Sequence, residues 1–229
     1  MTADIPANHE YADFLKATRA SYDAIAPAYT DRFPDWLADS HPLDRSLISA
    51  FTELAREHVP APVADLGSGP GYVTAHLDGL GIPVFGVDLS PRMVALARTA
   101  HPELRFHVGS MTSLDLPAET LGGILALYSV IHIPTEHLAA AFAEFHRVLV
   151  PGGHVLLGFQ SVRPDGDEEH LHLAERFGHE ISLDYYWRTP DTVAAHLGKA
   201  GLPVQARVLR EPVEGEKRPR AFVLARKQL

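Results

Sequence analysis

The sequence predicts an α/β fold, with a doubly wound, mostly parallel sheet and helices on both of its faces. Between residues 62 and 160, short apolar segments of strand length alternate with segments of helical periodicity, and such strands are typical of a parallel sheet buried on both faces. Near the C-terminus, "VQARVLRE" and "RPRAFVLARK" flank the turn-forming "PVEGEK". We therefore expect the chain to end in an antiparallel strand pair.

Composition and charge restrict the class of protein. The 229 residues, 46% hydrophobic and 21% charged, suit one large domain or a core domain with small additions. The net charge of -9 argues against a nucleic-acid partner, and the absence of cysteine excludes disulfides and thiolate catalysis. No secretory signal is visible, and the longest apolar-rich stretch, "ILALYSVIHI", is too short to cross a bilayer. We expect a cytoplasmic protein with no membrane partner.

The elements follow in a regular order. Residues 9–58 carry apolar side chains at helical spacing, and Pro27 and Pro34 are expected to break this region into two or three helices. Strands and helices then alternate. In order they are the strand "PVADL", the helix "GYVTAHLDGL", the strand "IPVFGVDL", the helix "RMVALARTA" with Ser90 as cap and Pro91 in its first turn, the strands "LRFHVG" and "LGGILALYS", the helix "TEHLAAAFAEFHRVL" and the strand "GGHVLLGFQ".

Residues 161–188 interrupt this alternation. The segment is polar and aromatic, and it is too long for a plain connection. We expect its charged part, "DEEHLHLAERFGHE", to form a solvated cap helix. A last helix, "TPDTVAAHLGKAGL", precedes the terminal strand pair, with Asp191 near its start and Gly201 past its end.

Three glycines in "VADLGSGPGY" mark a binding loop. Gly67, Gly69 and Gly71 follow a strand and open a helix, where glycine tolerates positive φ and lets a ligand approach the backbone. Their spacing is tighter than the Gly-x-Gly-x-x-Gly of dinucleotide sites. Asp88 ends the next strand beside this loop, where a carboxylate can accept both hydroxyls of a ribose. Alternatively, Asp88 only starts a turn and caps the helix that follows.

The segments "VADLGSGPG", "GVDLS" and "VLVPGGHVLLG", in this order, resemble the class I S-adenosylmethionine-dependent methyltransferases, particularly their small-molecule branch. The resemblance extends from about residue 20 to the C-terminus. It implies S-adenosylmethionine as cofactor and a seven-stranded sheet with an antiparallel last strand. Residues 1–58 would then form an N-terminal helical lid, and residues 59–229 a methyltransferase core with an acceptor-pocket insertion at 161–188.

Carried over position by position, the resemblance assigns a cofactor site. The family usually has an acidic residue where Ser110 stands, and often one where Gly123 stands, so adenine recognition is expected to use backbone and hydroxyl contacts. The two tyrosines of "SYDAIAPAY" either cover the cofactor or pack their helix against the core. The implied contacts are Tyr22 and Tyr29 over the cofactor; Asp65, Gly67, Ser68, Gly69 and Gly71 around its methionine part; Asp88 on the ribose and Leu89 beside the adenine; Ser110 and Met111 at the adenine edge; and Tyr128 and Ser129 at the sulfonium.

The acceptor side has weaker signals. His132 in "YSVIHIP" is the candidate base and a substrate-binding residue, or it forms hydrogen bonds without taking a proton. His170, Tyr185 and Tyr186 of the insertion are further candidate substrate contacts. Tyr185 and Tyr186 would point to opposite faces of a strand, and either one alternatively packs the insertion onto the domain. The histidines of the insertion match no metal-ligand spacing, so we expect no metal.

Together these patterns predict an enzyme that transfers a methyl group from S-adenosylmethionine to an oxygen, nitrogen or carbon of a small molecule. Aromatic or cationic acceptors of natural-product type would suit the aromatic insertion. One alternative is a nicotinamide-dependent oxidoreductase, against which the glycine spacing and the terminal strand pair count. Another is a non-catalytic module that keeps the cofactor pocket. The sequence does not define the oligomeric state.

Overall fold

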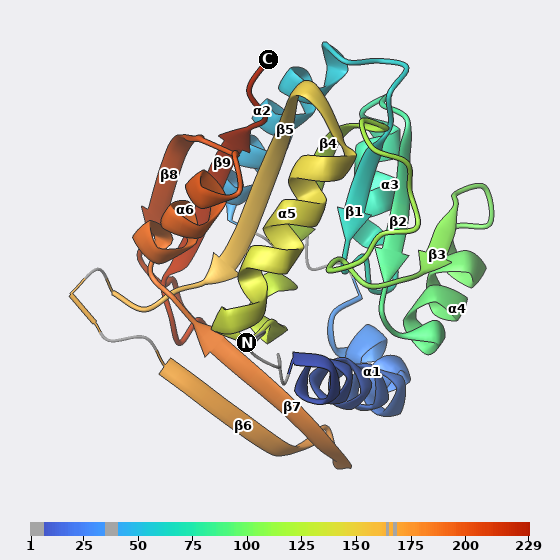
Figure 1. The fold of residues 1–229 in the computed structure, drawn as a ribbon. Coiled ribbons are helices and arrows are strands. Elements are labelled where there is room, and N and C mark those ends of the chain that lie inside the picture. The colour runs from blue at the N-terminus through green and yellow to red at the C-terminus, as the bar shows by residue number, and fades with distance from the viewer. Residues whose placement is uncertain (1–6, 35–40, 164, 167–168) are drawn as a thin grey trace, which may run out of the picture.

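A seven-stranded sheet organises the molecule, shown as a computed structural model in Figure 1. The structure describes residues 7–34, 41–163, 165–166 and 169–229. The strands of the sheet are β1 (Val63–Leu66), β2 (Val84–Asp88), β3 (Phe106–Val108), β4 (Leu121–Leu127), β5 (Leu149–Gln160), β8 (Val204–Arg210) and β9 (Arg220–Arg226). Their order across the sheet is β3-β2-β1-β4-β5-β9-β8. Strands β1 to β5 are parallel and β9 is antiparallel to both of its neighbours, which confirms the predicted fold class.

Helices cover both faces of this sheet. In Figure 1, α5 and α6 lie in front of the sheet and α2 lies behind it, while α4 packs beside the edge strand β3. None of the helices in the described ranges is long and apolar enough to traverse a lipid bilayer. The helices are α1 (Ala7–Arg32), α2 (Pro42–Arg56), α3 (Tyr72–Gly79), α4 (Pro91–Ala100), α5 (Leu138–Val148) and α6 (Pro190–Lys199), with short 3-10 turns η1 (Val130–His132) and η2 (Thr135–His137) before α5.

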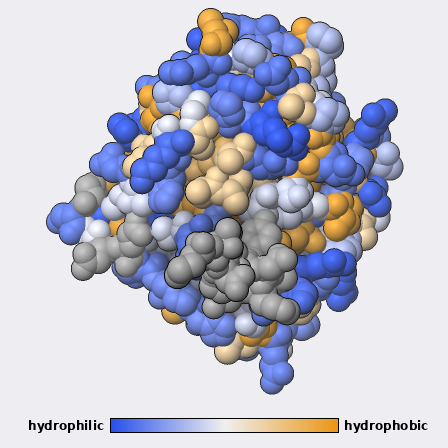
Figure 2. Space-filling view, viewed as in Figure 1, coloured by the Kyte–Doolittle hydropathy of each residue, from blue (hydrophilic) through white to orange (hydrophobic). Residues whose placement is uncertain are grey.

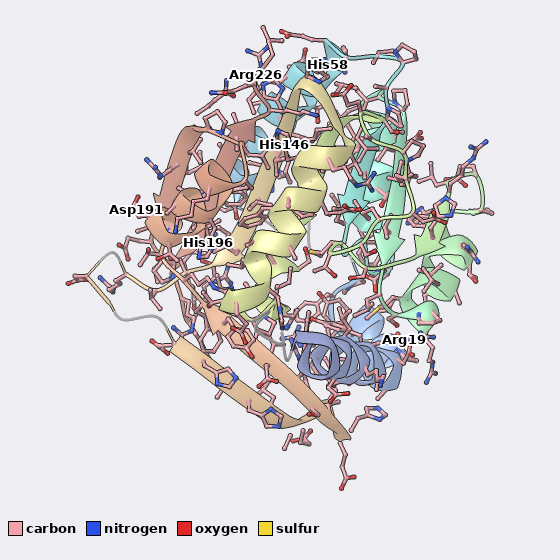
Figure 3. All side chains as sticks on the ribbon, viewed as in Figure 1. Arg19, His58, His146, Asp191, His196 and Arg226 are labelled. Carbon is pink, nitrogen blue, oxygen red and sulfur yellow. The ribbon has the colours of Figure 1, made fainter. Side chains whose placement is uncertain are left out.

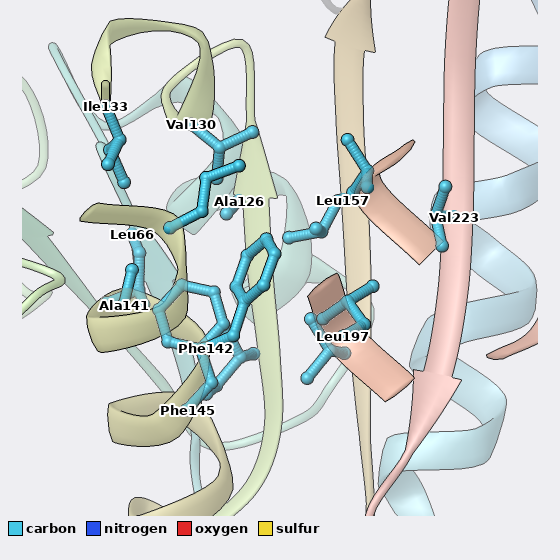
Figure 4. Close-up of a cluster of buried hydrophobic side chains, with 14 of the residues drawn as sticks. Leu66, Ala126, Val130, Ile133, Ala141, Phe142, Phe145, Leu157, Leu197 and Val223 are labelled. Carbon is cyan, nitrogen blue, oxygen red and sulfur yellow. The ribbon is translucent and has the colours of Figure 1, made fainter. Parts of the chain in front are cut away.

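The two faces of the sheet bury separate apolar cores. On the α5 face, Phe142 and Phe145 are fully buried beside Leu157 of β5 and Leu197 of α6 (Figure 4). On the other face, Phe51 of α2 belongs to a second buried cluster. Each large apolar side chain buried in this way contributes about 1.5–3 kcal/mol. The outer surface is mostly hydrophilic in the view of Figure 2, with apolar side chains in small groups.

The N-terminal helix is longer than the sequence indicated. The expectation that Pro27 breaks it is wrong, because α1 continues through Pro27 to Arg32. A proline inside a helix loses one hydrogen bond and strains the preceding turn. Ile25 and Ala26, directly before it, are completely buried, so tertiary packing offsets that cost. Pro34 lies in a turn after the helix, and residues 35–40 lie outside the described part of the chain.

The insertion is a β-hairpin rather than the expected cap helix. Its strands are β6 (Glu169–Arg176) and β7 (His179–Trp187), which pair antiparallel outside the main sheet, with β7 beside α1 (Figure 1). The sequence "HLHLAE" alternates apolar and polar residues, which is the strand period. Phe177 and Gly178 both have positive φ, at 54° and 78°, as a two-residue hairpin turn requires. The prediction of a helix, which relied on the charge content of this segment, is therefore wrong.

Candidate active site

A cavity of about 530 Å³ opens at the carboxyl ends of the neighbouring strands β1 and β4, where the strand order reverses. This is the position where ligands bind in doubly wound sheets, and the volume lies within the usual range for small-molecule sites. Helix α1, the end of the hairpin and the turn between β8 and β9 complete its walls. Segments that are far apart in the sequence therefore share one enclosed space.

The glycine loop forms one wall, and its geometry explains two of its glycines directly. At Gly67, with φ at +80°, a Cβ atom would collide with the side chain of Ser129. At Gly71, with φ at +92°, a Cβ atom would lie 2.7 Å from the ring of Phe106. Gly69 also has positive φ, at +52°, but space is open around its Cβ position. The loop thus turns tightly and leaves its backbone exposed to the cavity at Gly69.

Two buried carboxyl groups lie beside this loop. Asp88 accepts hydrogen bonds from the backbone N–H groups of Gly69 and Ser90, each at 2.8 Å. Burial raises the pKa of Asp88 to about 6, although these two N–H groups oppose the shift. Asp65 accepts a 2.6 Å hydrogen bond from the Thr74 hydroxyl, and burial raises its pKa to about 7. Both carboxyl groups line the cavity, and their hydrogen bonds favour the charged form whereas burial opposes it.

A tyrosine and a histidine in the wall of the cavity are hydrogen-bonded to each other. The Nδ1 atom of His132 lies 2.8 Å from the carbonyl oxygen of Asp184, which can only accept, so Nδ1 carries the proton. The Nε2 atom of His132 therefore accepts the hydrogen bond from the Tyr22 hydroxyl, at 2.7 Å. Burial lowers the pKa of His132 to about 4, and the charge of Arg176 adds to this effect. His132 is a neutral imidazole whose lone pair is already engaged.

Most of the residues assigned from the sequence line this cavity together. Ser129 donates a 2.8 Å hydrogen bond to the Leu66 carbonyl, and Tyr128 has a positive φ of 54° at the end of β4. The positions that line the cavity are Tyr22, Tyr29, Asp65, Gly67, Ser68, Gly69, Asp88, Leu89, Ser110, Met111, Tyr128, Ser129 and His132.

Four assigned residues do not line it. Gly71 packs against Phe106 at the start of α3. Tyr185 lies behind His132, with ring centroids 4.7 Å apart, so it contacts the cavity wall from outside. Tyr186 and His170 stack on each other on the hairpin, with ring centroids 4.7 Å apart. They lie on the face opposite to Tyr185, because neighbouring positions of β7 point to opposite faces. These positions give no direct contact to a molecule in the cavity.

Two histidines of the hairpin share one carboxylate oxygen. His170 Nε2 and His172 Nδ1 lie 2.7 and 3.0 Å from the same Oδ1 atom of Asp184. Neither their spacing nor this shared oxygen provides a set of converging ligands. Within the described ranges, no group of three or more His, Cys, Asp or Glu side chains could hold a metal ion.

The two departures from the family pattern have different explanations. At Gly123, a Cβ atom would lie 2.9 Å from the ring of Phe51 in α2, so an acidic side chain has no room there. Ser110 does line the cavity, and its hydroxyl is 2.7 Å from that of Thr112. The first departure is a consequence of packing, and the second leaves two hydroxyl groups in place of one carboxylate.

Several cavity residues were missed by sequence reasoning. Arg176 enters from the hairpin and Phe33 from the end of α1, while Gln160 ends β5. Glu216 and Arg220 come from the turn before β9 and from β9 itself. No local motif marks these residues. The one available signal was the alternating pattern of the hairpin, which would have put Arg176 at the end of a strand beside a turn.

Comparison with known proteins decides the family. The model of a methyltransferase domain matches residues 63–153. The carboxy-S-adenosyl-L-methionine synthase of Chromohalobacter salexigens is 31% identical over 188 residues, which are 72% of this chain and 69% of that protein. The chain belongs to the class I S-adenosylmethionine-dependent methyltransferase family.

Other members of this methyltransferase family are also similar. The demethylmenaquinone methyltransferase of Chlorobaculum parvum is 32% identical over 140 residues, 59% of this chain and 56% of that protein, so the match spans little more than half of that relative. The solved structure of 1,6-didemethyltoxoflavin-N1-methyltransferase from Burkholderia thailandensis has a TM-score of 0.68 and 24% identity, covering 100% of this chain and 94% of that chain. This likeness shows the shared fold.

The methyltransferase cavity fits the cofactor of the family. The open space beside Gly69 admits an amino-acid tail, and the Asp88 carboxylate, although it accepts from Gly69 and Ser90, keeps lone pairs for the hydroxyls of a ribose. The Ser68 hydroxyl is buried at the same wall and has no hydrogen-bond partner among the described residues. A buried polar group without a partner costs about 1–3 kcal/mol, so a ligand that pairs with Ser68 would remove this cost.

Proposed function

We propose that this protein transfers the methyl group of S-adenosylmethionine to a small molecule held in the same cavity. The observation that carries the proposal is the continuity of one cavity. It joins the glycine loop and Asp88 on one side to Tyr22, His132 and Arg176 on the other. An acceptor bound beside the second group of residues would be aligned with a cofactor bound beside the first, and such alignment is the main requirement for methyl transfer.

The cofactor side would be held by main-chain and carboxylate groups. Asp88 would accept from the ribose hydroxyls, and Asp65 with the backbone of Gly67 and Gly69 would surround the amino-acid tail. Leu89 would flank the adenine. The bound cofactor would supply a methyl carbon activated by positive sulfur. The remaining positions proposed to contact it are Tyr22, Tyr29, Ser68, Ser110, Met111, Tyr128 and Ser129.

The acceptor side has aromatic walls, which support a planar, aromatic acceptor. Tyr22 and Tyr29 lie edge to face with centroids 6.2 Å apart, and Phe33 lies 5.0 Å from Tyr29. Rings in such arrangements favour contact with a further ring. The two methyltransferases compared above are likewise named for small molecules, demethylmenaquinone and 1,6-didemethyltoxoflavin.

His132 would act as a positioning residue. In its neutral form it accepts from the Tyr22 hydroxyl, and its Nδ1 proton is bound by the Asp184 carbonyl. This arrangement supports the alternative in which His132 forms hydrogen bonds without taking a proton. Its role would be to hold Tyr22 against the cavity and to link α1 to the hairpin.

Helix α1 and the hairpin would exclude water from the reaction. Ser21 and Tyr22 of α1 contact β7 and η1, and α1 also reaches α4, where Asp23 accepts a 2.6 Å hydrogen bond from Ser90. We therefore propose α1 as the lid within residues 1–58. The core of residues 59–229 would carry the hairpin within residues 161–188 as an acceptor-side wall.

Calorimetry and a methyl-transfer assay test this function. We expect S-adenosylhomocysteine to bind to the wild-type protein, and NAD not to bind. With S-adenosylmethionine and a panel of small aromatic acceptors, mass spectrometry should detect a product one methylene group heavier. Asp88→Asn should bind S-adenosylhomocysteine at least tenfold more weakly, since a charged hydrogen bond contributes about 1.5–3 kcal/mol.

Two outcomes would contradict the proposal. Binding of NAD without binding of S-adenosylhomocysteine would favour an oxidoreductase. Tight binding of S-adenosylhomocysteine with no methylated product across the panel would favour a non-catalytic binding module.

A further inference from the structure

Arg176 places a guanidinium group in the cavity, beside aromatic rings and a phenol. It is the last residue of β6, and its Nη1 donates to the Tyr185 hydroxyl. Its guanidinium carbon lies 6.0 Å from the ring centroid of Tyr29 and 4.9 Å from that of Phe177. Across the residues that the structure describes, no carboxylate forms an ion pair with Arg176. Its neighbours are therefore aromatic rings and a phenol.

A second arginine in the same cavity shows the contrast. Arg220 lies 3.4 Å from the carboxylate of Glu216, so its charge is compensated within the protein. A partly buried guanidinium strongly favours a nearby anion, and its planar set of donors matches a carboxylate with two parallel hydrogen bonds. Arg176 has donors available for this purpose, since one phenol oxygen does not occupy them all.

The charge of Arg176 belongs to the acceptor side of the cavity. It lowers the pKa values of Tyr22, Tyr29 and His132. For the two tyrosines it opposes burial, which raises the pKa, and for His132 it adds to burial, which lowers the pKa. Burial is the main cause of the raised pKa values of Asp65 and Asp88. A neighbouring carboxylate adds to it in each case, hydrogen bonds oppose it, and Arg176 is not among the causes. The cation therefore lies near Tyr22 and His132 rather than near the glycine loop.

We propose that the methyl acceptor carries an anionic oxygen group, such as a carboxylate or an ionised phenol, and that Arg176 binds this group. The inference rests on the proposed function and narrows its aromatic acceptor to an aromatic anion, in place of the cationic molecule that the sequence also allowed. A cationic acceptor would be repelled by Arg176. An acceptor that enters already ionised also needs no general base, which agrees with a neutral His132 whose lone pair is engaged.

Paired ligands and a matched variant test this assignment. The probes are four aromatic acids, namely benzoate, salicylate, indole-3-carboxylate and 1-hydroxy-2-naphthoate, each compared with its own carboxamide. Binding is measured by calorimetry with the protein saturated by S-adenosylhomocysteine. We expect at least one acid to bind roughly tenfold or more tightly than its amide, as a charged hydrogen bond would give. Arg176→Met should abolish this preference.

Arg207→Met provides the control for charge removal. Arg207 does not line the cavity, and it forms an exposed ion pair with Asp191, which Figure 3 shows on the outer side of α6, remote from α1. This variant should keep the preference for the acid. Thermal unfolding of both variants verifies that they fold, and Arg176→Lys, which keeps the charge but not the planar donors, should retain part of the preference.

Three results would overturn the assignment. The first is that no acid binds the wild-type protein more tightly than its amide. The second is that the preference survives in Arg176→Met. The third is that Arg176→Met weakens S-adenosylhomocysteine at least tenfold but leaves 5′-methylthioadenosine unchanged, because the guanidinium would then bind the carboxylate of the cofactor. None of these results affects the proposed methyl transfer, which fails only if S-adenosylhomocysteine does not bind or no product forms.

Discussion

At Asp88, burial and hydrogen bonding act in opposite directions on one carboxyl group. Burial raises its pKa to about 6, whereas the N–H groups of Ser90 and Gly69 favour the charged form. The group therefore changes its charge just below neutral pH. A ribose whose two hydroxyl groups both donate hydrogen bonds to Asp88 requires the ionised form of this carboxyl group.

Affinity for the nucleoside part of the cofactor should therefore depend on pH. Below the pKa of about 6, protonation of Asp88 removes an acceptor, and the affinity for 5′-methylthioadenosine should fall by roughly tenfold per pH unit. This probe has a ribose but no amino-acid tail, so Asp65 does not contribute to its binding. Calorimetry between about pH 5 and pH 8 measures the effect.

The matched variant is Asp88→Asn, which should bind the probe more weakly than the wild type at neutral pH and show no such dependence. A wild-type affinity that stays constant across this range would contradict the assignment of Asp88 to the ribose. At the residue scale, the sequence was sufficient to place Asp88 at the end of a strand beside the glycine loop, because this arrangement is a local pattern. The shifted pKa came only from its burial in the folded protein.

At the scale of the elements, the hairpin of β6 and β7 stands where the sequence predicted a helix. The same hairpin forms part of the cavity wall. It holds α1 through a buried serine. The Ser21 hydroxyl accepts from the backbone N–H of Ser182 at 3.0 Å, and it lies 2.7 Å from the Ala17 carbonyl in its own helix. Ser21 is only 2% exposed, so water cannot replace these hydrogen bonds.

Removal of this contact should loosen the wall of the cavity. Ser21→Ala leaves the Ser182 N–H without a partner, and the free energy of unfolding should fall by about 1–3 kcal/mol. Chemical denaturation measures this change, and hydrogen exchange at the Ser182 amide should become faster.

The control is Ser46→Ala, since Ser46 also donates to the carbonyl four residues earlier but is exposed in α2. That change should stay within about 0.5 kcal/mol. Equal stability of the Ser21→Ala and Ser46→Ala variants would show that the contact between α1 and β7 contributes little.

Over the whole molecule, a buried ion network joins the N-terminal region to the C-terminal strands. Arg210 of β8 donates to both carboxylate oxygens of Asp44 in α2, each at 3.0 Å, and to both oxygens of Glu216, at 2.8 and 2.9 Å. Asp44 is 3% exposed and Arg210 is 8% exposed. The hydrogen bonds of Arg210 lower the pKa of Glu216, although burial acts in the opposite direction. Asp44 and Glu216 also line the cavity, so this network supports its far wall.

Breaking the network should destabilise the protein as a whole. Asp44→Ala removes one carboxylate from a buried arginine, and such changes lower the free energy of unfolding by about 3–5 kcal/mol. Chemical denaturation of the intact chain measures it. Asp191→Ala, which removes the partner of the exposed Arg207, should leave stability unchanged because solvent screens that pair. A similarly small effect for Asp44→Ala would mean that Glu216 alone compensates Arg210.

Local sequence by itself determined the alternation of strands and helices between residues 62 and 160, the position of the glycine loop and of Asp88 beside it, and the antiparallel end of the sheet. Each of these depends on residues within a few positions of one another, through side-chain periodicity or permitted backbone angles. Only the tertiary structure decided that Arg176 faces the cavity, that His132 is neutral and bound to Tyr22, and that α1 passes through Pro27 unbroken. These features arise from contacts and burial between segments more than a hundred residues apart, or from packing that offsets a local cost, and no short stretch of sequence contains that information.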